Sequence, residues 1–256
     1  MLELARNADV LVENYKVGTL KRYGLDYASL KAINPRLIYL SITGFGQDGP
    51  MADKPGYDYV FQGMGGLMSY TGQPDGSPGA GPLRTGVAVV DVSTGMYATS
   101  AVLAALFQRQ QTGEGQHLDI ALLDVAVALN ANQGANYLVS GKNPQRSGNA
   151  HPNCAPYEVF GCADGYLILA IGNDTQFARF CDVARRPDLA QDPRYVTNSG
   201  RIEHLTELRK VLTALFPTRS RADWTAAFDA AGVPWGPIHT MEEVFAHPQV
   251  QHRQLR

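Results

Sequence analysis

One carboxylate stands out in residues 85–116, whose sequence is TGVAVVDVSTGMYATSAVLAALFQRQQTGEGQ. Asp91 follows a short apolar run, and a helix pattern rich in small residues begins just after it. Asp is a favoured helix N-cap, which is the ordinary interpretation of such a position. Ser93 and Thr94 are equally good caps and lie closer to the helical run, so the Asp91 carboxylate is not needed as a cap. A carboxylate there could attack an acyl group as a nucleophile.

The expected surroundings of Asp91 suit a nucleophile. We expect a strand over residues 87–90 and a helix over about 93–111, which places Asp91 where open α/β sheets bind ligands. A helix N-terminus nearby would favour the ionised carboxylate, which is the attacking form. An acyl anhydride survives only where water is kept out. The glycine-rich segment 72–86 could provide such a cover.

Two other patterns fail on their context. The GxGxxG match at residues 44–49 is followed by Pro50 and by no helix pattern, so it does not predict a dinucleotide site. His151, Cys154 and Cys162 lack a fourth ligand and the spacing of a zinc site. We therefore expect no metal.

Composition narrows the class of protein. The chain has 256 residues, 45% of them hydrophobic, and a formal net charge of −2, which gives no basic field for nucleic acid or an anionic membrane. No apolar run approaches the roughly 20 residues of a membrane span. The three cysteines form no CxxC pair, which favours a reducing compartment. We expect a cytoplasmic protein, with an organelle matrix as the alternative.

The elements that must position Asp91 follow an α/β pattern. Apolar runs at residues 10–12 and 37–43 flank a short helix pattern, which predicts a βαβ unit with a parallel sheet. A strand is expected at 117–120, followed by a helix. Beyond a turn-rich stretch at 140–157 the pattern changes to a hairpin around residues 163–165 and then helices. The later helices are expected at 175–184, 201–215 and 221–231, with a short strand and helix after them.

The chain contains, in this order, ADVLVENYKVGTLKRYGLDYASLKAINPRLIYLSITGFGQDGP, GYDYVFQGMGGLMSYTG, VVDVSTGMYA, RQQTGEGQHLDIALLD and PYEVFGCADGYLILAIGND. Together these segments resemble the family III (CaiB/BaiF-type) CoA-transferases. The resemblance implies a Rossmann-like large domain with a parallel sheet, a smaller α+β domain, and an interlocked homodimer. The domain boundaries become 1–145 for the large domain and 146–240 for the small one, with 241–256 beginning a return to the large domain.

The resemblance also implies a mechanism. Asp91 matches the family's catalytic aspartate, which attacks an acyl-CoA thioester and forms an acyl-aspartyl anhydride and then an aspartyl-CoA thioester. An acceptor carboxylate then takes the CoA. CoA and its acyl esters are substrates in this scheme, and no prosthetic group is expected. The expected partners are an acyl-CoA and a small carboxylic acid, with no nucleic acid and no membrane.

Positions expected to contact CoA cluster in two segments. Asn14, Tyr15 and Arg22 match CoA-contacting positions of the family. Lys16, Lys21 and Arg22 form a local basic patch that suits phosphates, although a solvated helix face would look the same. The complete expected set is Asn14, Tyr15, Lys16, Arg22, Gly56 and Tyr57.

A racemase-type enzyme acting on 2-methylacyl-CoA is the main alternative. Racemases of the superfamily carry His where this chain has Tyr57, and tyrosine is a poor base at neutral pH. Asp174 aligns with the racemase's acidic partner, but it cannot supply the missing base. CoA transfer is therefore preferred. A second alternative is an inactive fragment that acts only as a binding or structural remnant.

The substrate and the chain ends complete the expectations. The sequences of several segments resemble most the family branch that uses succinyl-CoA and dicarboxylates such as glutarate. A distal carboxylate needs a cation or donor, and Arg84, Arg146 and His151 are the candidates. Family members are longer at both ends, so we expect this chain to lack the first strands of the large domain and its C-terminal return.

Overall fold

The computed structural model describes residues 1–256 and divides into two compact units, Met1–Arg146 and Ser147–Arg256. The division falls one residue beyond the boundary expected between the large and small domains. Residues 241–256, expected to begin a return to the large domain, group with the second unit.

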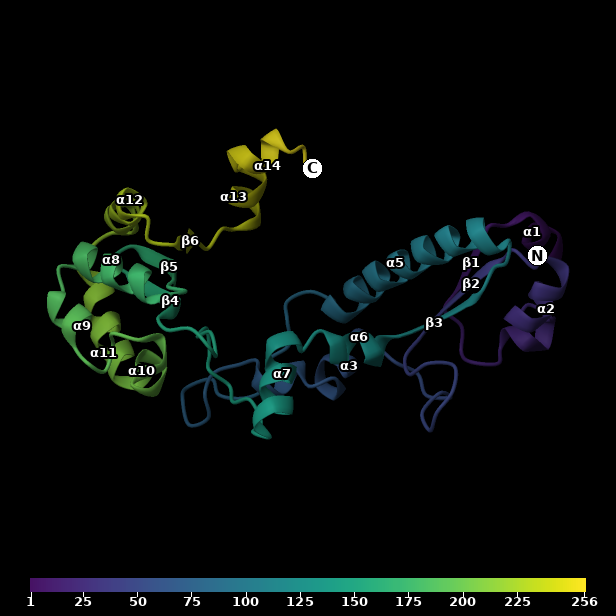
Figure 1. The fold of residues 1–256 in the computed structure, drawn as a ribbon, viewed down its shortest axis with the longest axis horizontal. Coiled ribbons are helices and arrows are strands. Elements are labelled where there is room, and N and C mark those ends of the chain that lie inside the picture. The colour runs from purple at the N-terminus through teal and green to yellow at the C-terminus, as the bar shows by residue number, and fades with distance from the viewer. The chain divides into compact units, whose positions relative to one another are not determined.

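The first unit is built around a three-stranded parallel sheet in the order β1-β2-β3 (Figure 1). Its elements are α1 (Leu2–Asn7), β1 (Val10–Glu13), η1 (Leu20–Tyr23), α2 (Tyr27–Ile33), β2 (Ile38–Thr43), α3 (Asp58–Met64), α4 (Leu67–Tyr70), α5 (Val89–Thr112), β3 (His117–Ala121), α6 (Leu122–Ala128) and α7 (Ala131–Ser140). The expected βαβ unit and the α/β class are confirmed, with Val10 of β1 opposite Ile38 of β2.

The two faces of this sheet differ in polarity. Ile42 of β2 packs with the apolar cluster of α3, α5 and α6. On the other face Tyr39 packs with α1 and α2, and its hydroxyl donates to the carbonyl of Leu25. Burial raises the pKa of Tyr39 to about 12, so this donor stays protonated. Beside it, Ser41 Oγ and His117 Nε2 form a 2.9 Å hydrogen bond.

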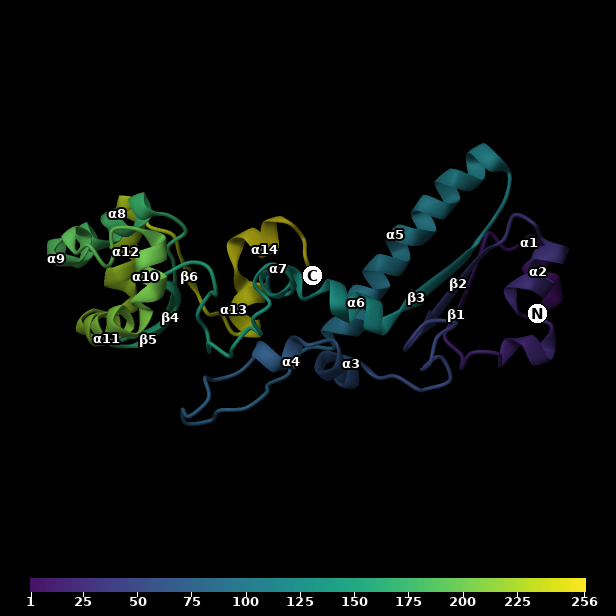
Figure 2. The ribbon, with the colours of Figure 1, turned by 60° about the horizontal axis from the view of Figure 1, so that its bottom comes forward.

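Helix α5 runs along β2 and β3 in both views of the ribbon (Figures 1 and 2). It ends at Gly113, whose backbone is left-handed with φ 78°. By length and composition alone this helix could cross a membrane, although the sequence analysis expects no apolar run of that length. Mostly buried core helices of soluble proteins pass the same test. Helix α5 packs against the sheet, α3 and α6, and 22% of its apolar window is buried.

The strand expected over residues 87–90 is wrong. Residues 89 and 90 already belong to α5, which starts at Val89, four residues before the expected start. The apolar, β-branched run favoured a strand. It becomes helix because the Asp58 carboxylate, 32 residues upstream of Val90, accepts that residue's backbone N–H and satisfies one of the free donors of the first turn.

The second unit pairs an antiparallel sheet, in the order β4-β5-β6, with helices. Its elements are β4 (Tyr157–Cys162), β5 (Gly165–Ala170), α8 (Asp174–Ala184), α9 (Pro187–Gln191), α10 (Asn198–Glu203), α11 (Leu205–Leu215), η2 (Phe216–Thr218), α12 (Arg221–Ala231), β6 (Trp235–Pro237), α13 (Met241–Ala246) and α14 (Pro248–His252). The expected hairpin is confirmed. The helix expected over 201–215 is instead two helices that meet at His204.

An aromatic core holds the second unit together. Phe160 of β4 stacks on Phe216 with ring centroids 4.5 Å apart, and Phe216 also contacts Trp224 of α12. All three rings are buried, and the Trp224 indole N–H donates to the Phe216 carbonyl, so this polar atom is satisfied.

Candidate active site

Asp91 lies in the first turn of α5 with an exposed side chain. The helix N-cap position is Ala88, which offers no side-chain hydrogen bond. Ser93 and Thr94, expected as caps, lie inside the helix, and the Thr94 hydroxyl donates back to the Val90 carbonyl at 2.7 Å. Asp91 is therefore not the N-cap of α5, and neither Ser93 nor Thr94 caps the helix in its place.

Asp58 of α3 takes the capping role from a distance. Its Oδ1 accepts the backbone N–H of Val90 at 2.8 Å and that of Asp91 at 3.2 Å. These N–H groups would otherwise remain unpaired at the helix start. The carboxylate of Asp58 thus joins the start of α3 to the start of α5.

The protonation of Asp91 departs from expectation. The helix N-terminus was expected to favour the ionised carboxylate. Instead, partial burial and then the charge of Asp58 raise the pKa of Asp91 above its ordinary value. Burial disfavours the charged carboxylate, and Asp58, which accepts the N–H groups at the helix start, adds a like charge nearby.

Gln62 of α3 fixes the position of Asp58. Its side chain is fully buried, and its Nε2 donates to Asp58 Oδ2 at 2.6 Å and to the Val87 carbonyl at 3.3 Å. Its Oε1 accepts the backbone N–H of Thr85 at 2.9 Å. One amide therefore connects α3 with the segment that leads into α5.

A cavity of about 270 Å³ lies next to this network. Most residues expected to contact CoA line it together, although they come from segments 40 residues apart: Asn14, Tyr15, Lys16, Gly56 and Tyr57. Lys54 adds a second cation that the sequence analysis did not single out. Tyr57 immediately precedes Asp58, so the cavity wall is continuous with the residue that holds the start of α5.

Gly56 is required by close packing. A Cβ there would lie 2.2 Å from the Phe61 ring and 2.9 Å from the Gly44 Cα. Any side chain would push the segment before α3 away from the end of β2. The glycine thus shapes the cavity wall, and nothing in the structure requires it to bind a ligand.

Arg22 does not join the cavity. It lies exposed on η1 and is absent from the lining. Its neighbour Lys21 lines a second cavity of about 340 Å³, which shares Lys16 and Val17 with the first. The basic patch expected from Lys16, Lys21 and Arg22 is therefore distributed over two cavities and the open surface.

The residues expected to bind a distal carboxylate have different surroundings. Arg84 is exposed in the segment before α5, with its guanidinium 5.7 Å from the Tyr59 ring centre. Arg146 is already engaged, because it pairs with Asp75 and donates to the Ser69 carbonyl. His151 belongs to the second unit and stacks on Tyr157 at 5.1 Å.

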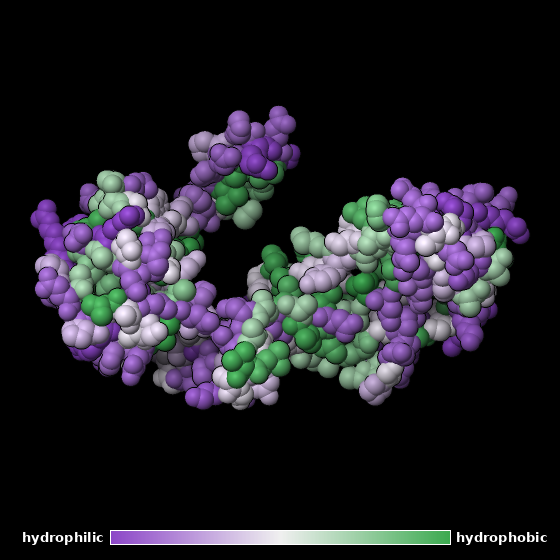
Figure 3. All heavy atoms as spheres, viewed as in Figure 1, coloured by the Kyte–Doolittle hydropathy of each residue, from purple (hydrophilic) through white to green (hydrophobic).

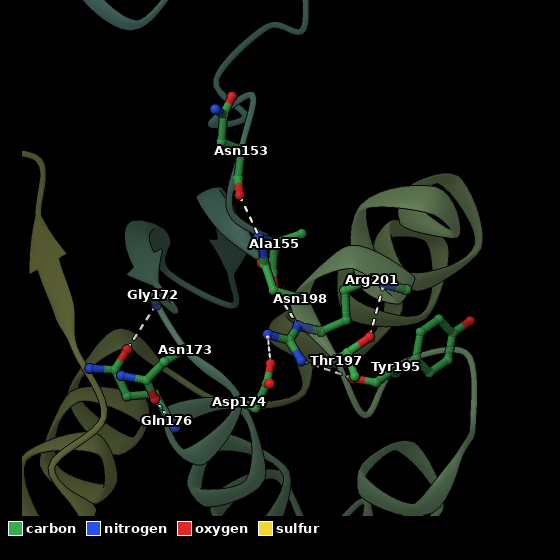
Figure 4. Close-up of polar contacts among 11 residues, drawn as sticks. Asn153, Ala155, Gly172, Asn173, Asp174, Gln176, Tyr195, Thr197, Asn198 and Arg201 are labelled. Atoms are coloured by element: carbon green, nitrogen blue, oxygen red, sulfur yellow. Dashed lines mark hydrogen bonds and ion pairs between the residues drawn. The ribbon is translucent and has the colours of Figure 1, made fainter. Parts of the chain in front are cut away.

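A buried arginine organises the segment that follows His151 (Figure 4). Arg201 is fully buried and donates to the Ala155 carbonyl at 2.6 Å and to the Tyr195 carbonyl at 2.9 Å. It also pairs with Asp174 at 2.8 Å. Asp174, aligned with the racemase's acidic partner, is thus the ion-pair partner of Arg201 at the start of α8.

Sequence reasoning missed Asp58, Gln62 and Lys54. Asp58 and Gln62 are four residues apart on α3, a spacing that places side chains on one face of a helix. That spacing could have suggested a pair, but their contacts with residues 85–91 depend on tertiary packing. No group of three or more His, Cys, Asp or Glu side chains is placed to hold a metal ion.

The comparisons with known proteins agree with the resemblance. The profile of CoA-transferase family III matches residues 1–256, so the chain belongs to that family. It is 53% identical over 253 residues to a succinate–glutarate CoA-transferase of Agrobacterium fabrum and 42% identical over 253 residues to the succinyl-CoA:glutarate CoA-transferase of Homo sapiens. Each match covers 99% of this chain.

A solved structure supports the fold. A CaiB/BaiF family protein from Brucella suis matches with a TM-score of 0.83 at 49% identity, over 98% of this chain and 66% of that protein. The chain spans 62% of the Agrobacterium relative and 57% of the human one.

Proposed function

We propose that the protein is a CoA-transferase that moves CoA from succinyl-CoA to a dicarboxylic acid such as glutarate. The observation that carries this proposal is Asp91, an exposed carboxylate of raised pKa at the start of α5. Its backbone N–H donates to Asp58, which follows Tyr57 in the wall of a cavity with two lysines. Family membership supports the reaction type. The substrates named for the two relatives support the donor and the acceptor.

The proposed chemistry proceeds through two anhydrides. The Asp91 carboxylate attacks the donor thioester, the C–S bond breaks, and CoA leaves as a thiolate. The thiolate attacks the Asp91 acyl carbon of the anhydride and releases the donor acid as a carboxylate. The acceptor carboxylate then attacks the aspartyl thioester and forms a second anhydride. The returning thiolate attacks the acceptor's acyl carbon, which gives the new acyl-CoA and restores Asp91.

The cavity beside Asp58 is the proposed CoA site. Lys16 and Lys54 suit the phosphates because ammonium groups bind phosphate as point charges. Asn14 and Tyr15 supply polar and aromatic surface in the same cavity. Gly56 lets the cavity wall pack closely against Phe61 and Gly44. Arg22 lies outside the cavity, so it could contact only a part of CoA that extends into solvent.

Arg84 is the proposed contact for the acceptor's second carboxylate. It is exposed, and it lies one residue before Thr85, which Gln62 joins to the Asp58 network. His151 lies in the second unit and stays a prediction from the sequence. Arg146 is no longer proposed, because Asp75 already neutralises it.

The direct test is a search for the covalent intermediate. The protein is mixed with succinyl-CoA, quenched, and digested for mass spectrometry, and the peptide with Asp91 should carry CoA as a thioester. Glutarate labelled with ¹⁸O in its carboxylates should then remove the CoA and leave one ¹⁸O on Asp91. Asp124→Asn, on the exposed side of α6, serves as the control variant.

Some outcomes would refute the proposal. Transfer without CoA on Asp91, or without ¹⁸O transfer to it, would assign the chemistry to another group. Deuterium uptake at the α-carbon of a 2-methylacyl-CoA would favour the racemase alternative.

We also propose that the active form is a homodimer and that it resides in the cytoplasm. An apolar stripe on α5 supports the dimer, because Val92, Met96, Leu103 and Phe107 are each more than half exposed. Figure 3 shows apolar side chains gathered over this part of the first unit. The cysteines, which are all free, support a reducing compartment.

A further inference from the structure

We propose that Asp58 is a positioning residue for the Asp91 nucleophile, fixed in turn by Gln62, and that its charge activates Asp91 by repulsion. This inference rests on the proposed function, since it explains how that function's nucleophile is held and made reactive. The argument depends on three sets of contacts, taken in order from the helix start to the buried amide.

The first contacts fix the backbone of the nucleophile. Asp58 Oδ1 accepts from the N–H groups of both Val90 and Asp91. A helix start frays when its first N–H groups are unpaired. With both paired, the Cα–Cβ bond of Asp91 has a set direction. No hydrogen bond or ion pair reaches the Asp91 carboxylate itself, so that group is free to meet a substrate.

The second contacts fix Asp58. Gln62 donates to Asp58 Oδ2, and this bond determines which oxygen turns toward α5. Gln62 cannot rotate to solvent because it is fully buried and its other amide atom already accepts from Thr85. Gln62 therefore fixes Asp58, and Asp58 in turn fixes the start of α5.

The third consideration is charge. A carboxylate in the first turn of a helix is normally stabilised by the free N–H groups there. Here Asp58 occupies two of them, so Asp91 loses that stabilisation and also meets a like charge. Formation of the acyl anhydride removes the charge on Asp91 and ends the repulsion. A carboxylate destabilised in this way is a stronger nucleophile, and its pKa rises as the structure indicates.

Other ionisable groups lie on the elements packed against α5. They are Tyr59 on α3, Tyr39 on β2, His117 and Asp119 on β3, and Asp124 on α6. Arg84 lies in the segment before α5. Asp58 is the charged group that acts on Asp91, and burial is the larger cause of the shift.

The experiment separates charge from position. Asp58→Asn keeps an oxygen acceptor for the helix N–H groups and removes the charge. Its amide nitrogen cannot accept from Gln62 Nε2, so this variant also loses that bond, and comparison with Gln62→Met, which loses the bond but not the charge, isolates the effect of the charge. Gln62→Met keeps the charge and removes the bonds that fix Asp58. Asp124→Asn removes a carboxylate from another helix beside α5 and is the matched control. For each variant, ¹³C NMR follows the titration of the Asp91 carboxyl, and kcat and KM for succinyl-CoA are measured against pH.

In Asp58→Asn we expect the Asp91 pKa to fall. Because Asp91 must be ionised to attack, the acid limb of kcat/KM then moves to lower pH. In Gln62→Met the Asp91 pKa should change less, while kcat falls by about tenfold or more through misplacement and KM stays within about twofold. Asp124→Asn should match the wild type in every measurement.

Two results would overturn the inference. One is an Asp58→Asn variant whose Asp91 titration and acid limb equal those of the wild type. The other is a Gln62→Met variant with wild-type kcat. The NMR titration needs no turnover, so it tests the inference even if the protein transfers no CoA. Absence of transfer in the wild type would contradict the proposed function instead.

Discussion

At the scale of single residues, Asp91 differs from an ordinary aspartate at a helix start because its carboxylate accepts no backbone N–H of the first turn. The Asp91→Asn variant should therefore lose CoA transfer without losing stability. Since the pKa of Asp91 is raised in the folded state, its ionised form opposes folding above that pKa, and Asn removes this effect. At pH 7 we expect an unchanged or slightly higher Tm, measured by calorimetry alongside single-turnover assays.

Two results would contradict that prediction. An Asp91→Asn protein that still transfers CoA, once deamidation is excluded by mass spectrometry, would exclude Asp91 as the nucleophile. A clear fall in Tm would show that its carboxylate stabilises the fold by a contact the structure does not contain.

Tyr57 leads to a second prediction at this scale. Its side chain is 73% exposed, and it precedes α3 at the N-cap position. With no histidine base at this position, the protein should not exchange the α-proton of a 2-methylacyl-CoA. Incubation in D₂O followed by mass spectrometry of the recovered thioester checks this. Incorporated deuterium would show that another base acts there.

The sequence alone could single out Asp91 as the proposed nucleophile but could not describe its surroundings. Asp91 was found from a lone acid before a helix pattern and from a family resemblance. Asn14, Tyr15, Lys16, Gly56 and Tyr57 were expected to act together, and they do line one cavity. Asp58 and Gln62 escaped notice because hydrogen bonds across 23 to 33 residues leave no local pattern.

At the scale of elements, the second unit depends on Arg201. Arg201→Met would leave the buried carbonyls of Ala155 and Tyr195 without a donor and would release Asp174. We expect a loss of about 2–5 kcal/mol in the free energy of unfolding of this unit. Urea denaturation followed by Trp fluorescence measures it, because Trp224 lies in its core.

The control for Arg201 is Arg194→Met. Arg194 pairs with Asp192 on the surface, where water screens the pair, so its loss should leave the denaturation midpoint almost unchanged. Equal effects of the two substitutions would mean that the buried contacts of Arg201 do not stabilise the unit.

Elements with strong local signals were predicted well, and those decided by distant contacts were not. The run at residues 37–43 is mostly apolar, with Ser41 and Thr43 as its hydroxyl-bearing aliphatic residues, and forms β2, which is buried on both faces. The run at 87–90 looks similar but partly joins α5, because Asp58 favours a helix start there. The helix expected over 201–215 breaks at His204, and no glycine or proline marks that break.

At the scale of the whole molecule, the exposed stripe on α5 predicts self-association. Val92, Met96, Leu103 and Phe107 recur at intervals of four and seven residues and therefore share one face of the helix. The double variant Leu103→Lys/Phe107→Glu should shift sedimentation toward the monomer. Arg194→Met, on the second unit, should sediment like the wild type. A wild-type chain that remains monomeric at high concentration would contradict the proposed dimer.

The polar face of the parallel sheet has a consequence for folding. Because side chains alternate along a strand, a slip of one residue in β3 would turn His117 and Asp119 toward the apolar underside of α5. It would also break the bond between His117 and Ser41 and the bond from the Gln47 N–H to Asp119. Apolar strands alone would tolerate several alignments. Burying these polar side chains without partners would raise the free energy of a misaligned sheet. They therefore favour the single register seen between β2 and β3.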